Sequence, residues 1–332
     1  MTQVIVTSAG SYPRIGDAPE TQRHRRAYAQ RERGEISEAE WQAVEDEVTR
    51  EVIAEQVAAG VELPTDGQIR WYDPISHVAR ALDNVAIDGL LRYCDTNCYF
   101  RQPVVRGRLG RTEPVLLREF EVARAAAAPH PVKPVVTGPY SLAQGSILEG
   151  GYRDHRDLAY AYADILAEEI AALARAGARL IQVDEPFLLR HAEDADVVDQ
   201  TFATLAAARG GAQLACYTYF GDALPLYDAL QTLPVDVLGL DLTYSPKLVR
   251  RIAEAGTAKV LALGLVDGRN TRLETEAVVH RVLDEVLPRA GGLVYLNPSC
   301  GLEFLPRDRA RAKLETLARL ARTYAGGEGG RR

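Results

Sequence analysis

The sequence predicts an α/β fold, a (β/α)8 barrel of the TIM type with an N-terminal helical elaboration. Three observations support this prediction: the chain has 332 residues, short runs rich in β-branched residues alternate with longer amphipathic stretches, and eight such runs are bounded by turn signals. Barrels of this kind routinely reach this length as one unit, so we expect a single barrel over residues 1–325. An open doubly wound sheet is the alternative.

The predicted elements follow one another along the whole chain. The eight strands are residues 4–8, 61–64, 132–137, 180–184, 213–217, 237–241, 260–264 and 293–297. The clearest helical patterns are residues 38–59, 156–176, 224–232, 274–287 and 306–324. Two segments exceed ordinary connection lengths, and they predict helices before the second strand and a hairpin-like insertion at about 93–113. The glycine-rich tail, residues 326–332, is expected to be disordered.

The composition excludes several classes of protein. The net charge is −7 and the charged residues are interspersed, so the chain has no basic stripe for nucleic acid. Its start lacks the pattern of a secretory signal, and no stretch reaches about 18 uninterrupted apolar residues. Four cysteines in so long a chain are not a disulfide framework. We expect a cytoplasmic protein with no membrane or nucleic-acid partner.

Polar and sulfur-containing residues follow the predicted strands. Active sites of α/β barrels lie at the C-terminal ends of their strands, so these side chains are expected to converge there. They are Gly10 and Ser11, Asp66, Gly138, Asp184 and Glu185, Cys216, Asp241, Asp267, and Cys300. A buried Asp184 is suited to hold a cationic amine, and a simple strand-to-helix turn with a capping carboxylate is the alternative.

Two of the four cysteines, Cys216 and Cys300, close predicted strands and suggest a metal site. Zinc takes three or four ligands among thiolate, imidazole and carboxylate, and Asp241 ends a strand between the two cysteines in sequence. No histidine falls at a strand end. The alternative to a metal site is that each cysteine is simply a small buried hydrophobic residue.

Seven motifs resemble those of the cobalamin-independent methionine synthase family, in the same order over nearly the whole length. They are Ser11-Tyr-Pro-Arg-Ile-Gly16, Thr65-Asp-Gly-Gln-Ile-Arg70, Thr137-Gly-Pro139, Gln182-Val-Asp-Glu-Pro186, Cys216-Tyr-Thr-Tyr-Phe-Gly-Asp222, Leu265-Val-Asp-Gly-Arg-Asn270 and Asn297-Pro-Ser-Cys-Gly-Leu302. The resemblance implies a barrel that methylates the thiol of homocysteine and so produces methionine. Some motifs resemble the non-catalytic N-terminal barrel of the long enzymes and others the catalytic one.

The resemblance also implies zinc, which the family binds through two Cys, one Glu and one His. The matching positions in this chain are Cys216, Cys300, Asp241 and Leu214. An aliphatic side chain cannot replace an imidazole, so the expected metal set is Cys216, Asp241 and Cys300 with an unidentified fourth ligand. In this hypothesis the metal holds homocysteine as its thiolate.

The resemblance to the family also implies substrate-binding and catalytic roles for residues of this chain. Asp184 is expected to anchor the substrate ammonium, and Asp184 and Asp267 are the predicted catalytic residues. Gln68 stands where the family has an acidic residue, and Arg269 where it has a proton-donating His. The predicted substrate-binding residues are Gly10, Ser11, Asp66, Gln68, Asp184 and Glu185.

The methyl donor and the partners are left open by the sequence. The long enzymes grip folate between two barrels and this chain has one, so the donor is either methyltetrahydrofolate or methylcobalamin, the latter delivered by a corrinoid protein. A second barrel subunit is another expected partner. Two alternatives remain: a transferase acting on another thiol or alkyl donor, and a catalytically silent barrel that serves as a partner subunit.

Overall fold

Seven parallel strands form the core of the structure, a computed structural model that describes residues 2–94 and 96–328. Their spatial order is β1-β10-β9-β8-β7-β6-β4, so neighbours in sequence are mostly neighbours in space. The strands are β1 Gln3–Val6, β4 Val135–Thr137, β6 Leu180–Asp184, β7 Gln213–Thr218, β8 Val237–Asp241, β9 Val260–Val266 and β10 Leu293–Pro298. This arrangement confirms the predicted α/β barrel.

The position of the predicted second strand, residues 61–64, holds no regular strand. Leu63 forms one parallel bridge with Thr7, and the N–H of Lys133 donates to the carbonyl of Pro64 over 3.0 Å. These contacts close the barrel between β1 and β4. The prediction of a full strand was wrong here because Pro64 has no N–H to donate and the segment is too short for a ladder.

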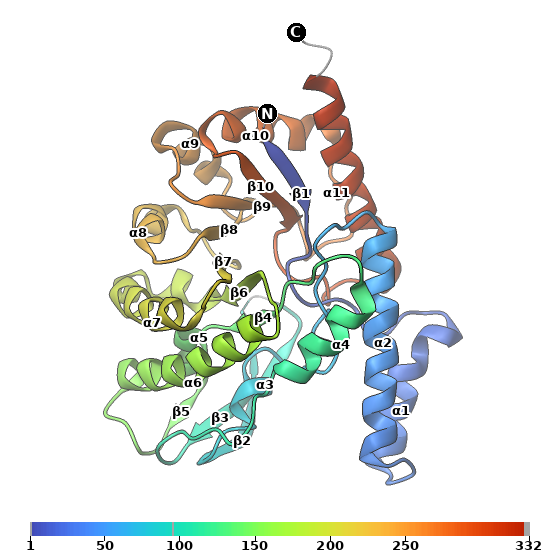
Figure 1. Cartoon of the computed structure of the whole chain (residues 1–332), viewed down its shortest axis with the longest axis vertical. Coiled ribbons are helices and arrows are strands. Elements are labelled where there is room, and N and C mark those ends of the chain that lie inside the picture. The colour runs from blue at the N-terminus through green and yellow to red at the C-terminus, as the bar shows by residue number, and fades with distance from the viewer. Residues whose placement is uncertain (1, 95, 329–332) are drawn as a thin grey trace.

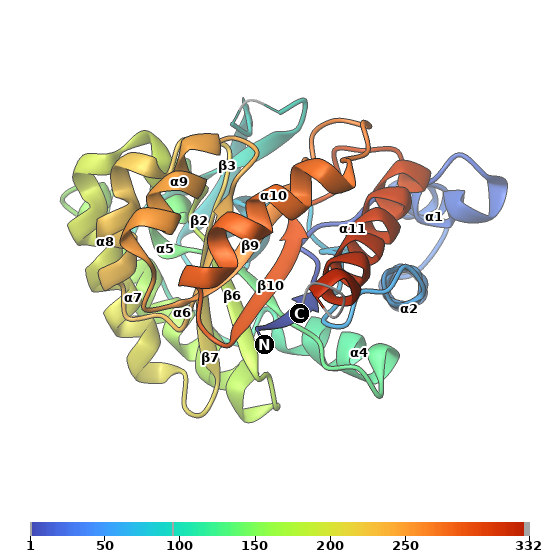
Figure 2. The same cartoon turned by 90° about the horizontal axis from the view of Figure 1, so that it is seen from above.

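Helices surround the barrel (Figures 1 and 2). Their bounds are α1 Arg23–Glu32, α2 Glu38–Ala58, α3 Ser76–Ala79, α4 Leu117–Ala127, α5 Pro139–Gly145, α6 His155–Arg175, α7 Ala195–Ala208, α8 Tyr227–Thr232, α9 Pro246–Ala255, α10 Glu276–Val286 and α11 Arg307–Glu328. Short 3-10 turns lie at Pro19–Gln22, Pro186–Arg190, Ala192–Asp194, Leu224–Leu226 and Leu287–Arg289. No helix among residues 2–94 and 96–328 is long and apolar enough to cross a membrane.

The N-terminal elaboration consists of α1 and α2, which stand side by side along one flank of the barrel (Figure 1). Ser37 begins α2 with a capping box: its hydroxyl accepts from the N–H of Glu40 at 3.2 Å, and the Glu40 carboxylate accepts from the N–H of Ser37 at 2.7 Å. α2 also contacts α4 and α11.

A small second sheet lies beside the barrel and corresponds to the predicted insertion. It pairs β2 Val85–Arg92 with β3 Tyr99–Val105 in an antiparallel hairpin, and β5 Ile147–Leu148 adds to β3. The hairpin therefore begins before the predicted limit of about 93. At the other end of the chain, α11 continues to Glu328, two residues beyond the predicted start of the tail, and residues 329–332 lie outside the described residues.

Alternating side chains divide the barrel strands into an inner and an outer face. Inside lies a cluster of Leu63, Leu180, Ala215, Tyr217, Val237, Ala262 and Tyr295. The much larger cluster between the strands and the helices takes the alternate residues of the same strands, such as Leu214 and Leu238. The face on which a residue lies therefore decides whether it can reach the mouth of the barrel.

Candidate active site

A narrow cleft opens where several strands of the barrel end. Its walls come from the segments after β1, β6, β7 and β10 and from the hairpin. The lining residues are Ala9, Ser11, Gln68, Pro74, Tyr93, Asp184, Tyr219, Phe220, Gly301, Glu303 and Phe304. This is the end of an α/β barrel where active sites are built.

Asp184, the last residue of β6, is the buried carboxylate of this cleft. One oxygen accepts from the Gln182 side-chain amide at 2.7 Å, and the other accepts from the Tyr219 hydroxyl at 3.0 Å. The side chain is 5% exposed, and this burial raises the pKa of Asp184 to about 7, against the lowering effect of the two hydrogen bonds. A cation that enters the cleft would restore the ionised form.

Lys133 lies below Asp184, inside the barrel. Its ammonium donates to the carbonyl of Ser8 at 2.9 Å and to the Tyr217 hydroxyl at 3.1 Å. Complete burial lowers the pKa of Lys133 to about 7, while the Asp184 charge acts in the opposite direction. Asp184 in the cleft and Lys133 beneath it are thus an acid and a base whose pKa values burial moves toward neutrality.

Ser11 and Glu303 form a second polar side of the cleft. The Ser11 hydroxyl hydrogen-bonds to the Glu303 carboxyl, whose pKa is raised by burial. Arg14 approaches Glu303 at 3.8 Å between Nη2 and Oε2. Gly301 permits the close packing here, because a Cβ at that position would lie 2.0 Å from the Ser11 hydroxyl oxygen.

Gly10 and Gln68 shape the loop between these two sides. Gly10 has a φ of +136°, which favours glycine, and its carbonyl accepts from the Thr65 hydroxyl at 2.6 Å. The Gln68 side chain lies across from it, with Oε1 3.6 Å from the position of a Cβ on Gly10. The structure therefore brings the predicted Ser11, Gln68 and Asp184 together in one cleft, with Gly10 beside them.

Glu185 does not line this cleft, and its predicted role in substrate binding has no support from its contacts. Its two oxygens accept from the N–H of Tyr140 at 3.0 Å and from the N–H and hydroxyl of Ser141 at 2.8 and 2.7 Å. Being adjacent to Asp184, it points to the opposite face of the strand. It holds the first turn of α5 in place.

Asp66 and Asp267 also lie outside the cleft lining. Asp66 accepts from the N–H of Gln68 at 3.0 Å, and burial followed by the charge of Glu119 raises the pKa of Asp66 to about 6. Asp267 forms an ion pair with Arg269, at 3.1 Å between Oδ1 and Nε. Their predicted contacts with substrate are therefore not supported by this geometry.

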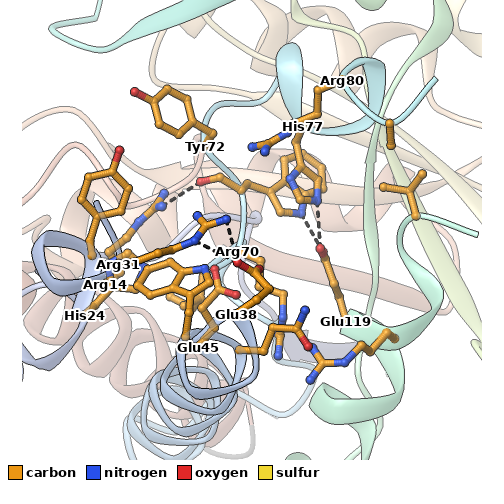
Figure 3. A pocket seen from close by; sticks show the side chains of 18 residues that line it. Arg14, His24, Arg31, Glu38, Glu45, Arg70, Tyr72, His77, Arg80 and Glu119 are labelled. Atoms are coloured by element: carbon orange, nitrogen blue, oxygen red, sulfur yellow. Dashed lines mark hydrogen bonds and ion pairs between the residues drawn. The ribbon is translucent and has the colours of Figure 1, made fainter. Parts of the chain in front are cut away.

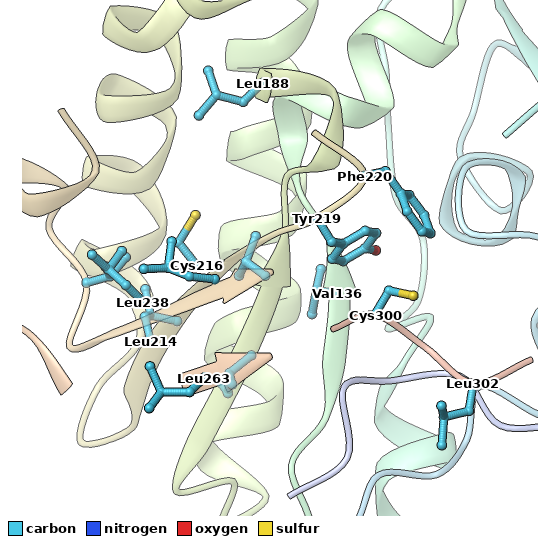
Figure 4. Packing of buried hydrophobic residues seen from close by; sticks show 14 of the residues in the cluster. Val136, Leu188, Leu214, Cys216, Tyr219, Phe220, Leu238, Leu263, Cys300 and Leu302 are labelled. Carbon is cyan, nitrogen blue, oxygen red and sulfur yellow. The ribbon is translucent and has the colours of Figure 1, made fainter. Parts of the chain in front are cut away.

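Cys216 is turned away from the mouth of the barrel. Its neighbours in β7, Ala215 and Tyr217, belong to the inner cluster, whereas Cys216 belongs to the outer one and is 1% exposed. Figure 4 shows it beside Leu214 and Leu238, apart from Cys300. The predicted set of Cys216, Asp241 and Cys300 is thus not brought together, because a metal ligand here would have to lie on the other face of β7.

Asp241 and Cys300 do lie near one another. The charge of Asp241, after burial, raises the pKa of the Cys300 thiol well above its ordinary value. One Asp241 oxygen accepts three hydrogen bonds from Thr243 and Tyr244, and the other is buried without a partner in the described structure. Among residues 2–94 and 96–328, no group of three or more His, Cys, Asp or Glu side chains is arranged to hold a metal. The zinc set implied by the resemblance does not fit these residues.

Sequence reasoning missed Tyr219, Glu303 and the aromatic wall of the cleft. Tyr93 from the hairpin approaches Tyr219 with their hydroxyl oxygens 3.5 Å apart, and Phe220 packs edge-on against Phe304 at 5.7 Å between ring centroids. Tyr219 lies within one of the seven motifs and Glu303 directly follows another, and this proximity to the motifs was the available signal.

The fold and the cleft define an α/β-barrel enzyme with a buried acidic site at the C-terminal ends of its strands. Comparison with known proteins gives the family: residues 5–323 match the family model for the cobalamin-independent synthase catalytic domain, and the chain belongs to this family. The match confirms the resemblance drawn from the seven motifs.

Named relatives agree with this assignment. The chain is 31% identical over 317 residues to a methionine synthase of Saccharolobus solfataricus, covering 94% of this chain and 92% of the relative. It is 30% identical over 322 residues to a methionine synthase of Sulfurisphaera tokodaii, covering 94% and 90%. A solved B12-independent methionine synthase from Shewanella sp. W3-18-1 has the same fold, with a TM-score of 0.80, 20% identity and 98% of each chain covered.

Proposed function

We propose that this chain is a methyltransferase that moves a methyl group to the thiol of homocysteine and so makes methionine. Family membership supports this reaction. The buried Asp184 at the end of β6 is the observation that indicates where on the protein the reaction takes place. Relatives called methionine synthase are spanned almost end to end by this single chain. A silent barrel serving only as a partner subunit is therefore disfavoured.

The groups that line the cleft suit each part of an amino-acid substrate. Asp184 receives the ammonium group, because a cation restores the ionised form that burial disfavours. The Gln68 amide is a neutral donor for the carboxylate, whereas the Ser11 hydroxyl is engaged with Glu303. Phe220 and Phe304 supply the apolar surface for the methylene chain and the sulfur.

Glu303 is the proposed proton acceptor of the thiol. Its pKa is raised by burial, which makes it a stronger base than an ordinary carboxylate. As the sulfur–carbon bond forms, the bond between the methyl group and its donor breaks. With methyltetrahydrofolate as donor, the leaving nitrogen requires a proton, and Glu303 can return the one taken from the thiol. No step is assigned to a metal, since the expected ligand set does not fit.

Methyltetrahydrofolate is the donor we propose, because the family is defined as cobalamin-independent. The substrates are then two small molecules. A corrinoid protein or a second barrel subunit as a partner of this chain remains a prediction.

Methionine formation from homocysteine, measured by mass spectrometry, tests the proposal. Protein would be incubated with methyltetrahydrofolate or methylcobalamin and with homocysteine, cysteine or 2-mercaptoethanol as acceptor. We expect transfer from the folate to homocysteine, and about a hundredfold lower kcat in Glu303→Gln, the typical worth of one general base. Faster transfer to another thiol would contradict the proposed substrate, and an unchanged kcat in Glu303→Gln would contradict the proposed base.

A further inference from the structure

A large cavity lies between the N-terminal helices and the barrel, outside the cleft. We call it the helical cavity, and its volume is about 340 Å³. Its lining comprises Arg14, His24, Tyr28, Arg31, Glu38, Trp41, Gln42, Glu45, Ile69, Arg70, Trp71, Tyr72, His77, Arg80, Ala81, Val115, Arg118 and Glu119. The cleft and the helical cavity have no lining residue in common.

The walls of the helical cavity are flat, aromatic and fixed in place. Trp71 stacks on His77 with ring centroids 4.9 Å apart and an interplanar angle of 14°. Glu119 holds both rings, accepting from the Trp71 indole at 2.9 Å and contacting the His77 Nε2 at 2.8 Å. His24 meets Trp41 edge-on, with ring centroids 5.0 Å apart. Figure 3 shows the contact between Glu119 and His77. Such walls favour a planar ring over an aliphatic chain.

Two buried polar groups face this space. His24 is 7% exposed, and its Nε2 has no hydrogen-bond partner in the part of the chain that the structure describes. Glu45 is equally buried on α2, and burial raises the pKa of its carboxyl to about 7. A buried polar atom without a hydrogen-bond partner costs free energy unless a ligand or water supplies that partner. A ligand that fits here would therefore be a ring with polar atoms of its own.

One arginine at the mouth of the helical cavity favours an anion. Five arginines and three glutamates line the helical cavity. Four of these arginines are already in ion pairs: Arg31 with Glu38, Arg14 with Glu303, and Arg70 and Arg118 with Asp46. Arg80 is exposed and forms no ion pair within the described residues. An arginine in this setting is suited to a phosphate or a carboxylate.

We propose that the helical cavity binds a planar heteroaromatic molecule that carries a phosphate or a carboxylate, at a site separate from the methyl-transfer cleft. The ring lies between the Trp41 and Trp71 walls with its polar atoms toward His24 and Glu45. The anionic group lies at the mouth, near Arg80. This proposal does not depend on the methyl-transfer reaction.

The fluorescence of the chain reports on this site directly, because both of its tryptophans line the helical cavity. The probes are AMP for a phosphate and quinaldate for a carboxylate, each compared with its neutral counterpart, adenosine or quinoline. We expect one or both anions to quench the emission with saturation below about 1 mM, while the neutral counterparts bind at least tenfold more weakly. Calorimetric titration of the same probes provides a second reading.

Variants identify the group that receives the anion. Arg80→Ala removes an exposed arginine and is expected to weaken binding of the anionic probe about tenfold, whereas the matched Arg250→Ala on α9 leaves it unchanged. Binding of AMP alone or of quinaldate alone supports the proposal and tells which anion the site prefers. The proposal is overturned if neither anion binds, if the neutral counterparts bind equally well, or if both variants behave alike.

Discussion

Replacing Asp184 with asparagine tests how much the buried charge of Asp184 costs the stability of the folded barrel. Asparagine has the same shape and can keep both hydrogen bonds: its oxygen accepts from Gln182, and its amide donates to the Tyr219 hydroxyl, which can rotate. What the substitution removes is the buried charge. The folded protein therefore no longer has to hold an ionised carboxylate inside the cleft.

The size of this effect follows from the pKa of Asp184, which burial raises from 3.8 to about 7. Because the folded-state pKa is raised, the cost is absent below pH 3.8, grows as the pH rises, and is complete above about pH 7. Its upper limit is roughly 4 kcal/mol. Lys133, with its pKa lowered to about 7, is mostly neutral at high pH, so losing its carboxylate neighbour costs little there.

Urea unfolding followed by tryptophan fluorescence measures the change. We expect Asp184→Asn to be more stable than the wild type by up to roughly 4 kcal/mol at about pH 8.5, and by less than half of that at about pH 5. Asp199→Asn, an exposed substitution on α7, serves as the control with no pH-dependent gain. A variant that is less stable at both pH values, or a gain that does not grow with pH, would refute the reasoning.

Three further predictions concern the residues around the cleft. The KM for homocysteine should rise about tenfold per pH unit below about pH 7, because a proton competes with the ammonium for Asp184, and a flat KM from pH 5 to 8 would contradict this. Glu185→Ala should lower the free energy of unfolding by about 3 kcal/mol at about pH 5, since three donors on α5 lose their acceptor, and by less above about pH 7, where the variant also loses a carboxylate whose pKa burial raises to about 7; KM should be unchanged in steady-state kinetics. Cys216→Ala should cost about 1–2 kcal/mol of stability, because its side chain packs among the apolar residues outside the barrel strands, and should leave kcat/KM unchanged; a fall in kcat/KM would place Cys216 in the site after all.

Much of the fold was predictable from the sequence because buried parallel strands are continuous apolar runs that interrupt a helical pattern. Residues 180–184 and 237–241, for example, were placed with their observed ends. The segment 61–64 was not, because one proline and a short length reduced a plausible run to a single bridge. Which residues close a barrel depends on partners far away in sequence, and local patterns do not contain that information.

The candidate site was predictable only in part, for a related reason. A strand buried on both faces shows no alternation, so the run from Leu214 to Tyr217 gives no sign that Cys216 points outward. Glu185 shows the opposite case: as the neighbour of an inward-facing Asp184, it had to point away. Glu303 was missed because it follows the last strand by several residues and reaches the cleft only through the turn after Cys300.

The claim at the centre of this account is that Asp184 receives the ammonium group of the substrate in the cleft. The most direct test compares kcat/KM for homocysteine with that for 4-mercaptobutyrate, which lacks the amino group, in the wild type and in Asp184→Asn. We expect the wild type to prefer homocysteine by about a hundredfold or more, the worth of a buried charge-assisted contact, and Asp184→Asn to lose most of that preference. A preference that persists undiminished in the variant would contradict the account.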